Sequence, residues 1–287
     1  MSYGALDFAR AAWSHPLAAG DRLGTLWRIF RWQVQSRLDG RGRTVPWVND
    51  ARLYVRRGMT GATGNIYHGL HEFADMGFFA HFLRPGDVFA DVGANVGTYT
   101  VIGAKVCGAK VHAFEPADET LPFLRRNIED NGIGDAVTVH EVALGEREGT
   151  VHFTVGRDTT NQIAEGGDAG STRPVPLRRL DDELAGVPLA AMKIDVEGAE
   201  EGLIKGASQV LSNPSLRAVQ IETITPFVEN AFAKAGYARR WYDPFTRTLS
   251  ASDQGLKPNN TLFVRDEPFV TERLRASRPV RVGKRAI

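Results

Sequence analysis

The sequence predicts an α/β fold with a mostly parallel, seven-stranded sheet that carries helices on both faces. Three observations predict it. Short apolar segments alternate with helical segments from about residue 85 onward, which is typical of parallel sheets. A glycine-rich turn follows the first of these strands. With 43% hydrophobic and 24% charged residues among 287, the composition excludes collagen-like, disordered and coiled-coil proteins.

The first sixty residues are predicted to form an extension of a helix and a hairpin. Residues 22–38 carry four arginines and place apolar residues at helical spacing, namely Leu23, Leu26, Trp27, Phe30, Val34 and Leu38. We expect this face to pack on the main domain or on a second copy in a homodimer. Trp27 and Trp32 leave peripheral membrane contact through residues 22–38 as the less favoured alternative. Alternating apolar residues around 49–51 predict the hairpin.

The charge is distributed unevenly along the chain. Residues 1–60 hold ten Arg and four Asp, residues 265–287 have a net charge of +4, and the residues between them carry a net charge of −9. The acidic middle argues against a nucleic-acid partner. We expect the basic ends to contact this acidic middle.

Sequence signals place the chain in the cytoplasm. The single cysteine, Cys107, forms no intramolecular disulfide and no cysteine-based zinc site, which suits a reducing compartment. The N-terminus carries Asp7, Arg10 and His15 and lacks the apolar core of a signal peptide. No segment approaches the roughly 18 apolar residues of a membrane span.

The main domain is predicted to span residues 61–266. A glycine-rich loop precedes a helix that begins near residue 69 and stops at Pro85. Predicted strands then alternate with predicted helices. The strands are 88–91, 110–114, 137–142, 191–195, 218–222, 237–242 and 260–265, and the helices are 97–107, 118–131, 198–211 and 226–235. A hairpin-like segment, 149–156, precedes a glycine-rich loop at 157–173 that is the candidate mobile lid. We expect residues 267–287 to form a frayed basic tail.

The turn after the first strand predicts a site for a nucleotide-type cofactor. The strand ends in Asp91, and Gly93, Asn95 and Gly97 follow before the next helix. Glycines in such a turn permit positive φ and let a ligand approach the backbone. The spacing differs from the G-x-G-x-x-G pattern of nicotinamide enzymes. Glu115, 24 positions after Asp91, ends the second strand at a distance typical of an acidic residue that binds a ribose diol.

The chain resembles the Rossmann-like S-adenosylmethionine-dependent methyltransferases, and within them the FkbM family. The motifs that carry the resemblance are DVGANVGTYT, FEP, EVALGEREGTVHF, KIDVEGAEEGLIKGA, IET and NNTLFV, in that order between residues 85 and 265. This resemblance implies a Rossmann-like methyltransferase fold and S-adenosyl-L-methionine as the cofactor. Residues 1–60 lie outside it.

The resemblance also implies a set of cofactor-binding residues. Glu115 would bind the ribose hydroxyls, with Pro116 beside it, and the turn Ala143-Leu144 would lie near the adenine. The segment that contains Tyr67 and His71 looks like the element that closes over the cofactor in relatives. The residues that would shape the methionine side are Asp91, Gly93, Asn95, Gly97 and Thr98.

Candidate catalytic residues come from the ends of the fourth and fifth strands and from histidines. Asp195 ends the fourth strand and Glu222 the fifth, so either carboxylate could take the proton of a hydroxyl acceptor. Together with Glu197 they could also hold Mg²⁺ through hard oxygen ligands. His71 and His68 are further candidate bases. We expect Lys193, inside the fourth strand, to pair with a neighbour.

The predicted reaction is O-methylation of a small-molecule, sugar or secondary-metabolite acceptor. Relatives in the FkbM family are associated with such acceptors. The Asn/Asp-Pro-Pro-Tyr/Phe element of enzymes that methylate bases is replaced here by Asp195-Val196-Glu197-Gly198. A nicotinamide-dependent oxidoreductase on a similar fold and a non-catalytic cofactor-binding interaction protein are the alternatives.

Overall fold

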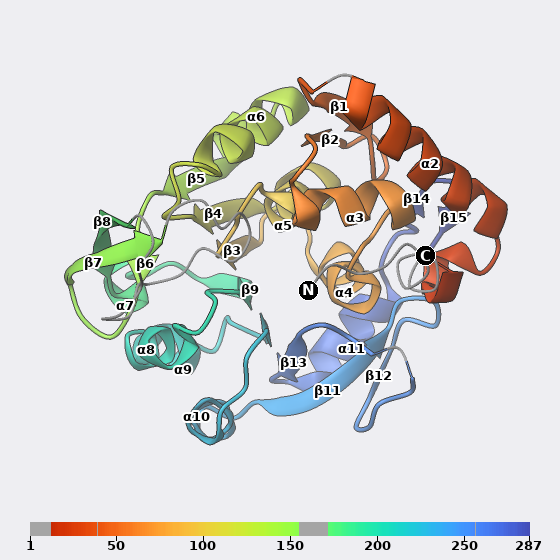
Figure 1. Ribbon diagram of the computed structural model, residues 1–287. Helices are drawn as coiled ribbons and strands as arrows, with labels where there is room; N and C mark the ends of the chain where they lie inside the picture. Colours follow the sequence, from red (N-terminus) through yellow and green to blue (C-terminus); the bar gives the residue numbers. More distant parts are fainter. Residues whose placement is uncertain (1–12, 39, 155–171, 256) are drawn as a thin grey trace.

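The computed structural model describes residues 13–38, 40–154, 172–255 and 257–287. Its centre is a sheet of eight strands in the order β12-β11-β13-β10-β9-β3-β4-β5 (Figure 1). Five neighbouring strands run parallel, namely β5 (Val137–His140), β4 (Lys110–Phe114), β3 (Val88–Val92), β9 (Leu189–Ile194) and β10 (Ala218–Ile221).

Antiparallel strands complete the sheet on one side. Strand β13 (Thr261–Val264) pairs antiparallel with β10, and β11 (Ala238–Asp243) pairs antiparallel with β13. The predicted mostly parallel, seven-stranded sheet is therefore confirmed. A short eighth strand that was not predicted, β12 (Thr248–Ser250), pairs with β11.

Helices cover both faces of the sheet, as predicted. Along β3 the side chains alternate between two buried clusters, with Phe89 in one and Ala90 and Val92 in the other. The first cluster is shared with α4 (Phe73–Phe82), α5 (Thr98–Val101), α6 (Leu121–Asn131) and α11 (Glu267–Arg275). The second lies under α7 (Leu180–Glu183), α8 (Glu200–Lys205), α9 (Ser208–Ser212) and α10 (Pro226–Lys234).

A small second sheet lies beside the carboxyl end of the main one. It consists of β6 (Ala143–Leu144), β8 (Thr172–Arg178) and β7 (Gly149–Thr154) in that order. The predicted hairpin-like segment is β7. Most of the predicted lid at 157–173, namely residues 157–171, lies outside the described residues. Two short 3₁₀-helices span Pro16–Ala18 and Gly134–Ala136. A π-helical turn at Ile102–Val106 continues α5.

The N-terminal segment forms the predicted helix and hairpin. Helix α2 spans Arg22–Leu38, and β1 (Arg43–Pro46) pairs antiparallel with β2 (Arg52–Val55). Side-chain amides of α6 satisfy the free edge of β2. The Asn127 Oδ1 accepts from the Tyr54 N–H at 2.6 Å and the Asn131 Oδ1 from the Arg52 N–H at 2.8 Å. The hairpin is thereby fixed to the main domain.

The expectation that the apolar face of α2 packs on the main domain was wrong, while packing of this face on a second copy stays a prediction. Leu23, Trp27 and Phe30 are exposed, and the helix buries Thr25 and Trp32 instead. Most of the apolar residues whose spacing predicted the helix are therefore exposed to solvent. Among the described helices, none is long and apolar enough to cross a bilayer.

The prediction of a glycine-rich loop before residue 69 was also wrong. This segment forms helix α3 (Thr60–His68). Ala62, Asn65 and Tyr67 of this helix are buried. Tertiary packing thus outweighs the weak helix propensity of its glycines. The helix ends at Gly69, whose φ of +90° suits glycine.

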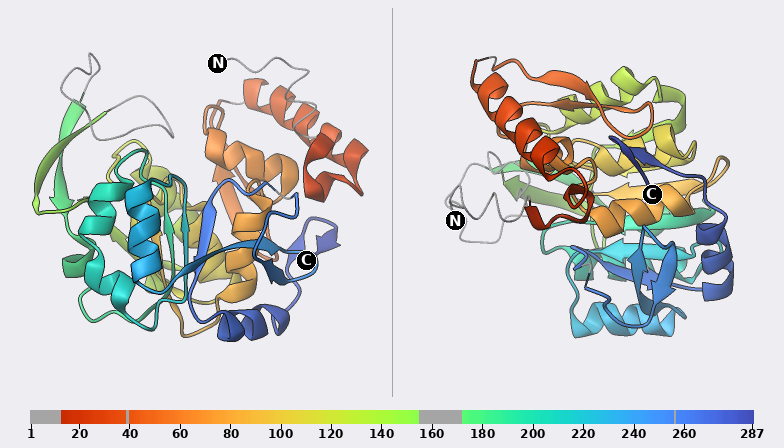
Figure 2. Two further views of the ribbon diagram at one scale, coloured as in Figure 1. Left: turned by 90° about the horizontal axis from the view of Figure 1, so that it is seen from below. Right: turned by 90° about the vertical axis from the view of Figure 1, so that its right-hand side faces the viewer.

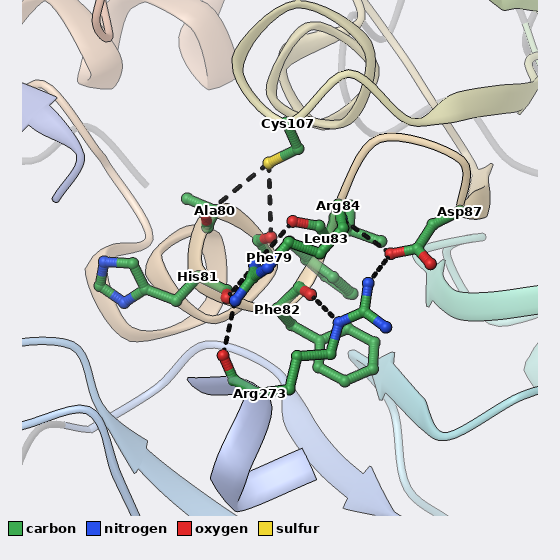
Figure 3. A network of polar contacts seen from close by, with 9 residues as sticks. All are labelled: Phe79, Ala80, His81, Phe82, Leu83, Arg84, Asp87, Cys107 and Arg273. Carbon is green, nitrogen blue, oxygen red and sulfur yellow. Dashed lines mark hydrogen bonds and ion pairs between the residues drawn. The ribbon is translucent and has the colours of Figure 1, made fainter. Parts of the chain in front are cut away.

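The predicted frayed tail is instead folded. It forms α11 and the strands β14 (Arg281–Val282) and β15 (Arg285–Ala286), and Val270 and Leu274 are fully buried. Figure 3 shows how α11 is held. The Arg273 Nε donates to the Phe82 carbonyl at 2.6 Å, and its guanidinium pairs with Asp87. The Arg84 guanidinium donates in turn to the Arg273 carbonyl at 2.6 Å.

Cys107 lies in the same region and is buried, as a small apolar side chain would be. Its thiol lies 3.6 Å from the Phe79 carbonyl oxygen (Figure 3). Burial raises the pKa of this thiol to about 12. The group is therefore a thiol rather than a reactive thiolate at neutral pH.

Candidate active site

A cavity of about 350 Å³ opens where four parallel strands end. Glu115 follows β4, Asp195 follows β9 and Glu222 follows β10, each directly after the last residue of its strand. All three line the cavity. Ligands of open α/β sheets bind at this edge, where the strand order reverses between β3 and β9.

The turn after β3 forms part of the cavity wall. Gly93 and Asn95 have φ values of +78° and +50°. A Cβ on Gly93 would lie 1.8 Å from the carbonyl oxygen of Asp195, so only glycine lets the turn approach the end of β9. The Asp195 N–H also donates to the Val92 carbonyl at 2.9 Å. Backbone contact therefore joins the two strand ends.

Backbone N–H groups hold Glu115 in place. Its Oε2 accepts from the Asn95 N–H at 2.7 Å and its Oε1 from the Ala117 N–H at 2.8 Å. The side chain is buried, and burial raises its pKa. Each oxygen retains acceptor capacity for a ligand hydroxyl.

Asp91 is not among the residues that line the cavity, and its expected place at the cofactor stays a prediction. It is fully buried, and its Oδ2 accepts from the Thr100 hydroxyl at 2.6 Å. Its Oδ1 has no hydrogen-bond partner among the described residues. Lys193 interacts electrostatically with this carboxylate, in part offsetting the burial that raises the pKa of Asp91.

Lys193 is a buried cation among acidic groups, and its predicted pairing is confirmed. Its Nζ donates to the Asp195 Oδ2 at 2.7 Å and lies 4.8 Å from the Tyr99 ring centroid. The Tyr99 hydroxyl donates to Glu72. Burial would lower the pKa of Lys193, but the acidic neighbours raise it above its usual value, so the side chain stays charged.

The carboxyl groups of Asp195 and Glu222 interact, and their pKa values move in opposite directions. Burial, the hydrogen bond with Asp195 and the negative charges nearby raise the pKa of Glu222 to about 8. Burial also raises the pKa of Asp195, but Lys193 and the hydrogen bond from Glu222 outweigh it and lower that pKa. Because the two carboxyls interact, they titrate as a pair. These shifts favour a protonated Glu222 beside an ionised Asp195 near neutral pH.

Glu197 completes an acidic trio at this edge. One carboxylate oxygen each of Asp195, Glu197 and Glu222 lies within 4.8 Å of the others. Glu197 has a φ of +46°, an uncommon conformation for a non-glycine residue. The predicted candidates from the two strand ends are thus brought together.

The remaining walls of the cavity are largely apolar. Pro116, Ala143 and Thr98 line it, as the resemblance implied. The small sheet adds residues of β6 and β7. Leu144, expected near the adenine with Ala143, also lines the cavity, whereas sequence reasoning missed three apolar lining residues, which are Phe114, Val142 and Phe153. Phe153 stands in an alternating strand with no local sign of a site, and only the packing of the small sheet brings it here.

Comparison with known proteins identifies the family. The model of the methyltransferase FkbM domain matches residues 91–241, which is more than half of the chain. The chain belongs to the FkbM methyltransferase family. This assignment favours a methyltransferase over the nicotinamide-dependent alternative.

Relatives of known name are similar over much of the FkbM domain. The 31-O-demethyl-FK506 methyltransferase FkbM of Streptomyces tacrolimicus is 28% identical over 187 residues, covering 52% of this chain and 71% of the relative. The hexuronic acid methyltransferase AglP of Haloferax volcanii is 29% identical over 194 residues, covering 65% and 70%. A solved methyltransferase FkbM from Methylobacillus flagellatus KT aligns with a TM-score of 0.42 at 17% identity. That alignment covers 70% of this chain and about half, 54%, of the solved one.

Two residues expected at the cofactor of this FkbM methyltransferase lie elsewhere. The Tyr67 hydroxyl accepts from the Gln33 side-chain amide of α2 at 2.9 Å, so Tyr67 faces the N-terminal helix rather than the cavity. Gly97, at φ +88°, caps α5 outside the lining, where a Cβ would lie 2.6 Å from a Leu124 methyl. Gly97 therefore shapes the turn without contacting the cavity.

Of the two candidate histidines, His71 alone lines the cavity. Its N–H donates to the Asn65 side chain at 2.9 Å, and its carbonyl accepts from the His15 ring at 3.1 Å. His68 stacks on His15 at 4.1 Å between ring centroids. Burial lowers the pKa of His68 to about 3. His68 is thus a neutral packing residue.

Proposed function

We propose that this FkbM-family methyltransferase uses S-adenosyl-L-methionine to methylate a hydroxyl of a small-molecule, sugar or secondary-metabolite acceptor. The observation that carries the proposal is the Asp195–Glu222 pair, which opens on the cavity at the strand edge. The names of two relatives state an O-demethylated macrocycle, FK506, and a hexuronic acid as what they methylate. Both are small molecules.

The residues of the cavity fit the proposed cofactor. Glu115 keeps acceptor capacity for the ribose hydroxyls, because each of its oxygens accepts a single backbone N–H. Phe114, Leu144 and Phe153 offer an apolar surface for an adenine ring. The acidic strand ends suit a cationic sulfonium. Bound S-adenosylmethionine would supply an activated methyl group.

The Asp195–Glu222 pair is proposed to take the proton of the acceptor hydroxyl. Lys193 donates to one oxygen of Asp195 and keeps the carboxylate ionised. Loss of the Glu222 proton above about pH 8 makes the pair a dianion and a stronger base. His71, which also lines the cavity, is proposed to position the acceptor.

Magnesium is not part of this proposal, although the oxygen donors of Asp195, Glu197 and Glu222 are those that it prefers. Lys193, 2.7 Å from Asp195, occupies one of those oxygens and repels a cation. The proton on Glu222 competes with a metal ion for a further carboxylate oxygen. Chelation with EDTA is therefore expected to leave the rate unchanged.

Calorimetric titration tests the proposal. We expect the protein to bind S-adenosylmethionine and S-adenosylhomocysteine but not NAD, and Glu115→Ala to weaken both adenosyl ligands at least tenfold. Asp118→Ala, at an exposed acidic residue two positions past Pro116, is the matched control. Transfer of labelled methyl to hexuronic acids, glycosides and macrocyclic alcohols then identifies the acceptor class. Cofactor binding with no transfer to any acceptor would favour the non-catalytic alternative, and binding of NAD alone would contradict the proposal.

A further inference from the structure

Helix α2 carries an exposed apolar stripe, which we call the outer face of α2. Leu23, Trp27, Phe30 and Leu38 are 80%, 61%, 59% and 83% exposed, and Val34 is also exposed. Trp27 and Phe30 stack on each other, with ring centroids 5.8 Å apart. Exposed apolar residues are ordinary when scattered, but a contiguous patch marks an interaction site.

The spacing of these five residues makes the stripe continuous. At about 100° per residue they fall within an arc of roughly 80° along the helix, and at 1.5 Å per residue the stripe is about 22 Å long. The residues that α2 buries, Thr25, Trp32 and Ser36, lie on the opposite side of the helix. The outer face is thus a second apolar face, separate from the one that packs.

The same helix is strongly basic. Residues 22–38 hold four arginines and no Asp or Glu. Arg31 and Arg37 are exposed and flank the outer face on its two sides. Arg31 has no ion pair with a described residue, and within the described part of the chain Arg28 pairs with Asp21, just before the helix. Among the described residues, no ion pair joins an arginine of α2 to an acidic residue of the segment 61–264.

Helix α2 is also peripheral, which leaves its outer face open to a large surface. Figures 1 and 2 show it on the outer side of α3, far from the central sheet. It is anchored there by side chains of its inner face. The Arg28 Nε donates to the Tyr67 carbonyl at 3.2 Å, and Gln33 donates to the Tyr67 hydroxyl.

We propose that the outer face of α2 docks on an anionic membrane surface, with the helix lying in the plane of the interface. Trp, Phe and Leu between basic residues are typical of helices that insert one apolar side among lipid headgroups. Arginines beside the stripe attract acidic headgroups. A second copy of this chain is disfavoured because two such faces would bring arginines together with no acidic residue of either helix to pair with.

Co-sedimentation of the full chain with vesicles tests this docking. We expect binding to vesicles that contain phosphatidylglycerol, little binding to pure phosphatidylcholine, and weakening by added salt, which shortens the Debye length to about 8 Å at 0.15 M. Trp27→Ser with Phe30→Ser should lower partitioning by more than tenfold. Arg31→Glu should lower it at least about fivefold, since one basic residue near such a surface contributes about 1 kcal/mol.

Matched variants separate docking from general surface effects. Phe227→Ser with Phe269→Ser removes two exposed aromatic residues from α10 and α11, and Arg278→Glu reverses an exposed charge outside α2. These controls should bind vesicles like the wild type. All variants should keep the wild-type melting temperature, and because vesicle binding needs no cofactor, the outcome does not depend on the proposed function.

Three results would overturn the docking proposal. The first is the absence of binding to anionic vesicles at low salt. The second is equal loss of binding in the controls and in the α2 variants. The third is a dimer, seen by analytical ultracentrifugation, that Trp27→Ser with Phe30→Ser dissociates while vesicles are not bound, which would assign the outer face to a second copy.

Discussion

Folded proteins usually bury apolar side chains and expose charged ones. The strand-end edge of the sheet and the outer face of α2 break this rule in opposite ways. The edge buries charge, with Asp91 and Lys193 almost inaccessible to water. The helix exposes Trp27 and Phe30. Neither arrangement is expected if stability of the fold were the only requirement, because buried charge and exposed apolar surface are both unfavourable. Such local violations concentrate at functional sites, and the comparison therefore sets the proposed catalytic region beside the proposed docking surface.

The largest expected effect is at the edge. Asp195→Asn removes the ionised member of the proposed proton acceptor and should lower kcat by about 10²–10⁴-fold, the usual contribution of a general base. Calorimetry should find S-adenosylhomocysteine affinity within a few-fold of the wild type. Asp135→Asn, at an exposed site, is the control. A kcat within tenfold of the wild type would remove Asp195 from the mechanism.

Replacing the buried cation should be the next largest effect. Lys193→Met leaves Asp91 and Asp195 without their cation and should lower the free energy of unfolding by about 3–5 kcal/mol. Lys205→Met, at a half-exposed ion pair with Glu146, should change it by less than about 0.5 kcal/mol. Urea denaturation at neutral pH measures both. Equal stability of the two variants would show that the buried charges are not coupled.

Substitution of two tryptophans in α2 compares how much its inner and outer faces contribute to stability. Trp32 is buried and Trp27 is 61% exposed. Trp32→Ala should cost about 3–5 kcal/mol of unfolding free energy through lost burial and an unfilled cavity. Trp27→Ala should cost less than about 0.5 kcal/mol. Thermal and urea melts of the pair test this, and a large loss in Trp27→Ala would mean that the outer face packs within the molecule.

The smallest effect is a pH dependence of the rate. Because the pKa of Glu222 is raised to about 8, the pair keeps its proton below that value and loses it above. The proposed base is thus weaker below pH 8, and kcat should rise with pH through this range and then level off. Glu222→Gln cannot titrate and should lack this rise. Stopped assays on both sides of pH 8 measure it, and an unchanged profile in the variant would place the titration elsewhere.

Much of the site was predictable because it depends on local pattern. Asp91, Glu115, Asp195 and Glu222 each stand at the end of an apolar run, and the carboxyl ends of parallel strands converge. Neither the depth of Asp91 nor the cavity position of Phe153 was predictable. Both depend on which way a side chain points after distant strands pair.

The outer face of α2 was harder to predict from the sequence than the strand-end edge. Periodicity located α2 at Arg22–Leu38 but not its orientation. An apolar stripe is equally compatible with packing inward and with facing a partner. The burial of Thr25 and Ser36 in place of Leu23 and Phe30 arises from α3, whose glycine-rich sequence did not predict a helix.

By itself the sequence determined seven strands of the central sheet, most of the helices between them and the acidic residues at the strand ends. These follow from short-range periodicity and turn chemistry, which are written along the chain. Only the tertiary structure decided that Lys193 binds Asp195, that Tyr67 turns away from the cavity and that α2 presents Trp27 to solvent. Those outcomes depend on contacts between residues far apart in sequence, whose geometry exists only once the sheet and its helices have packed.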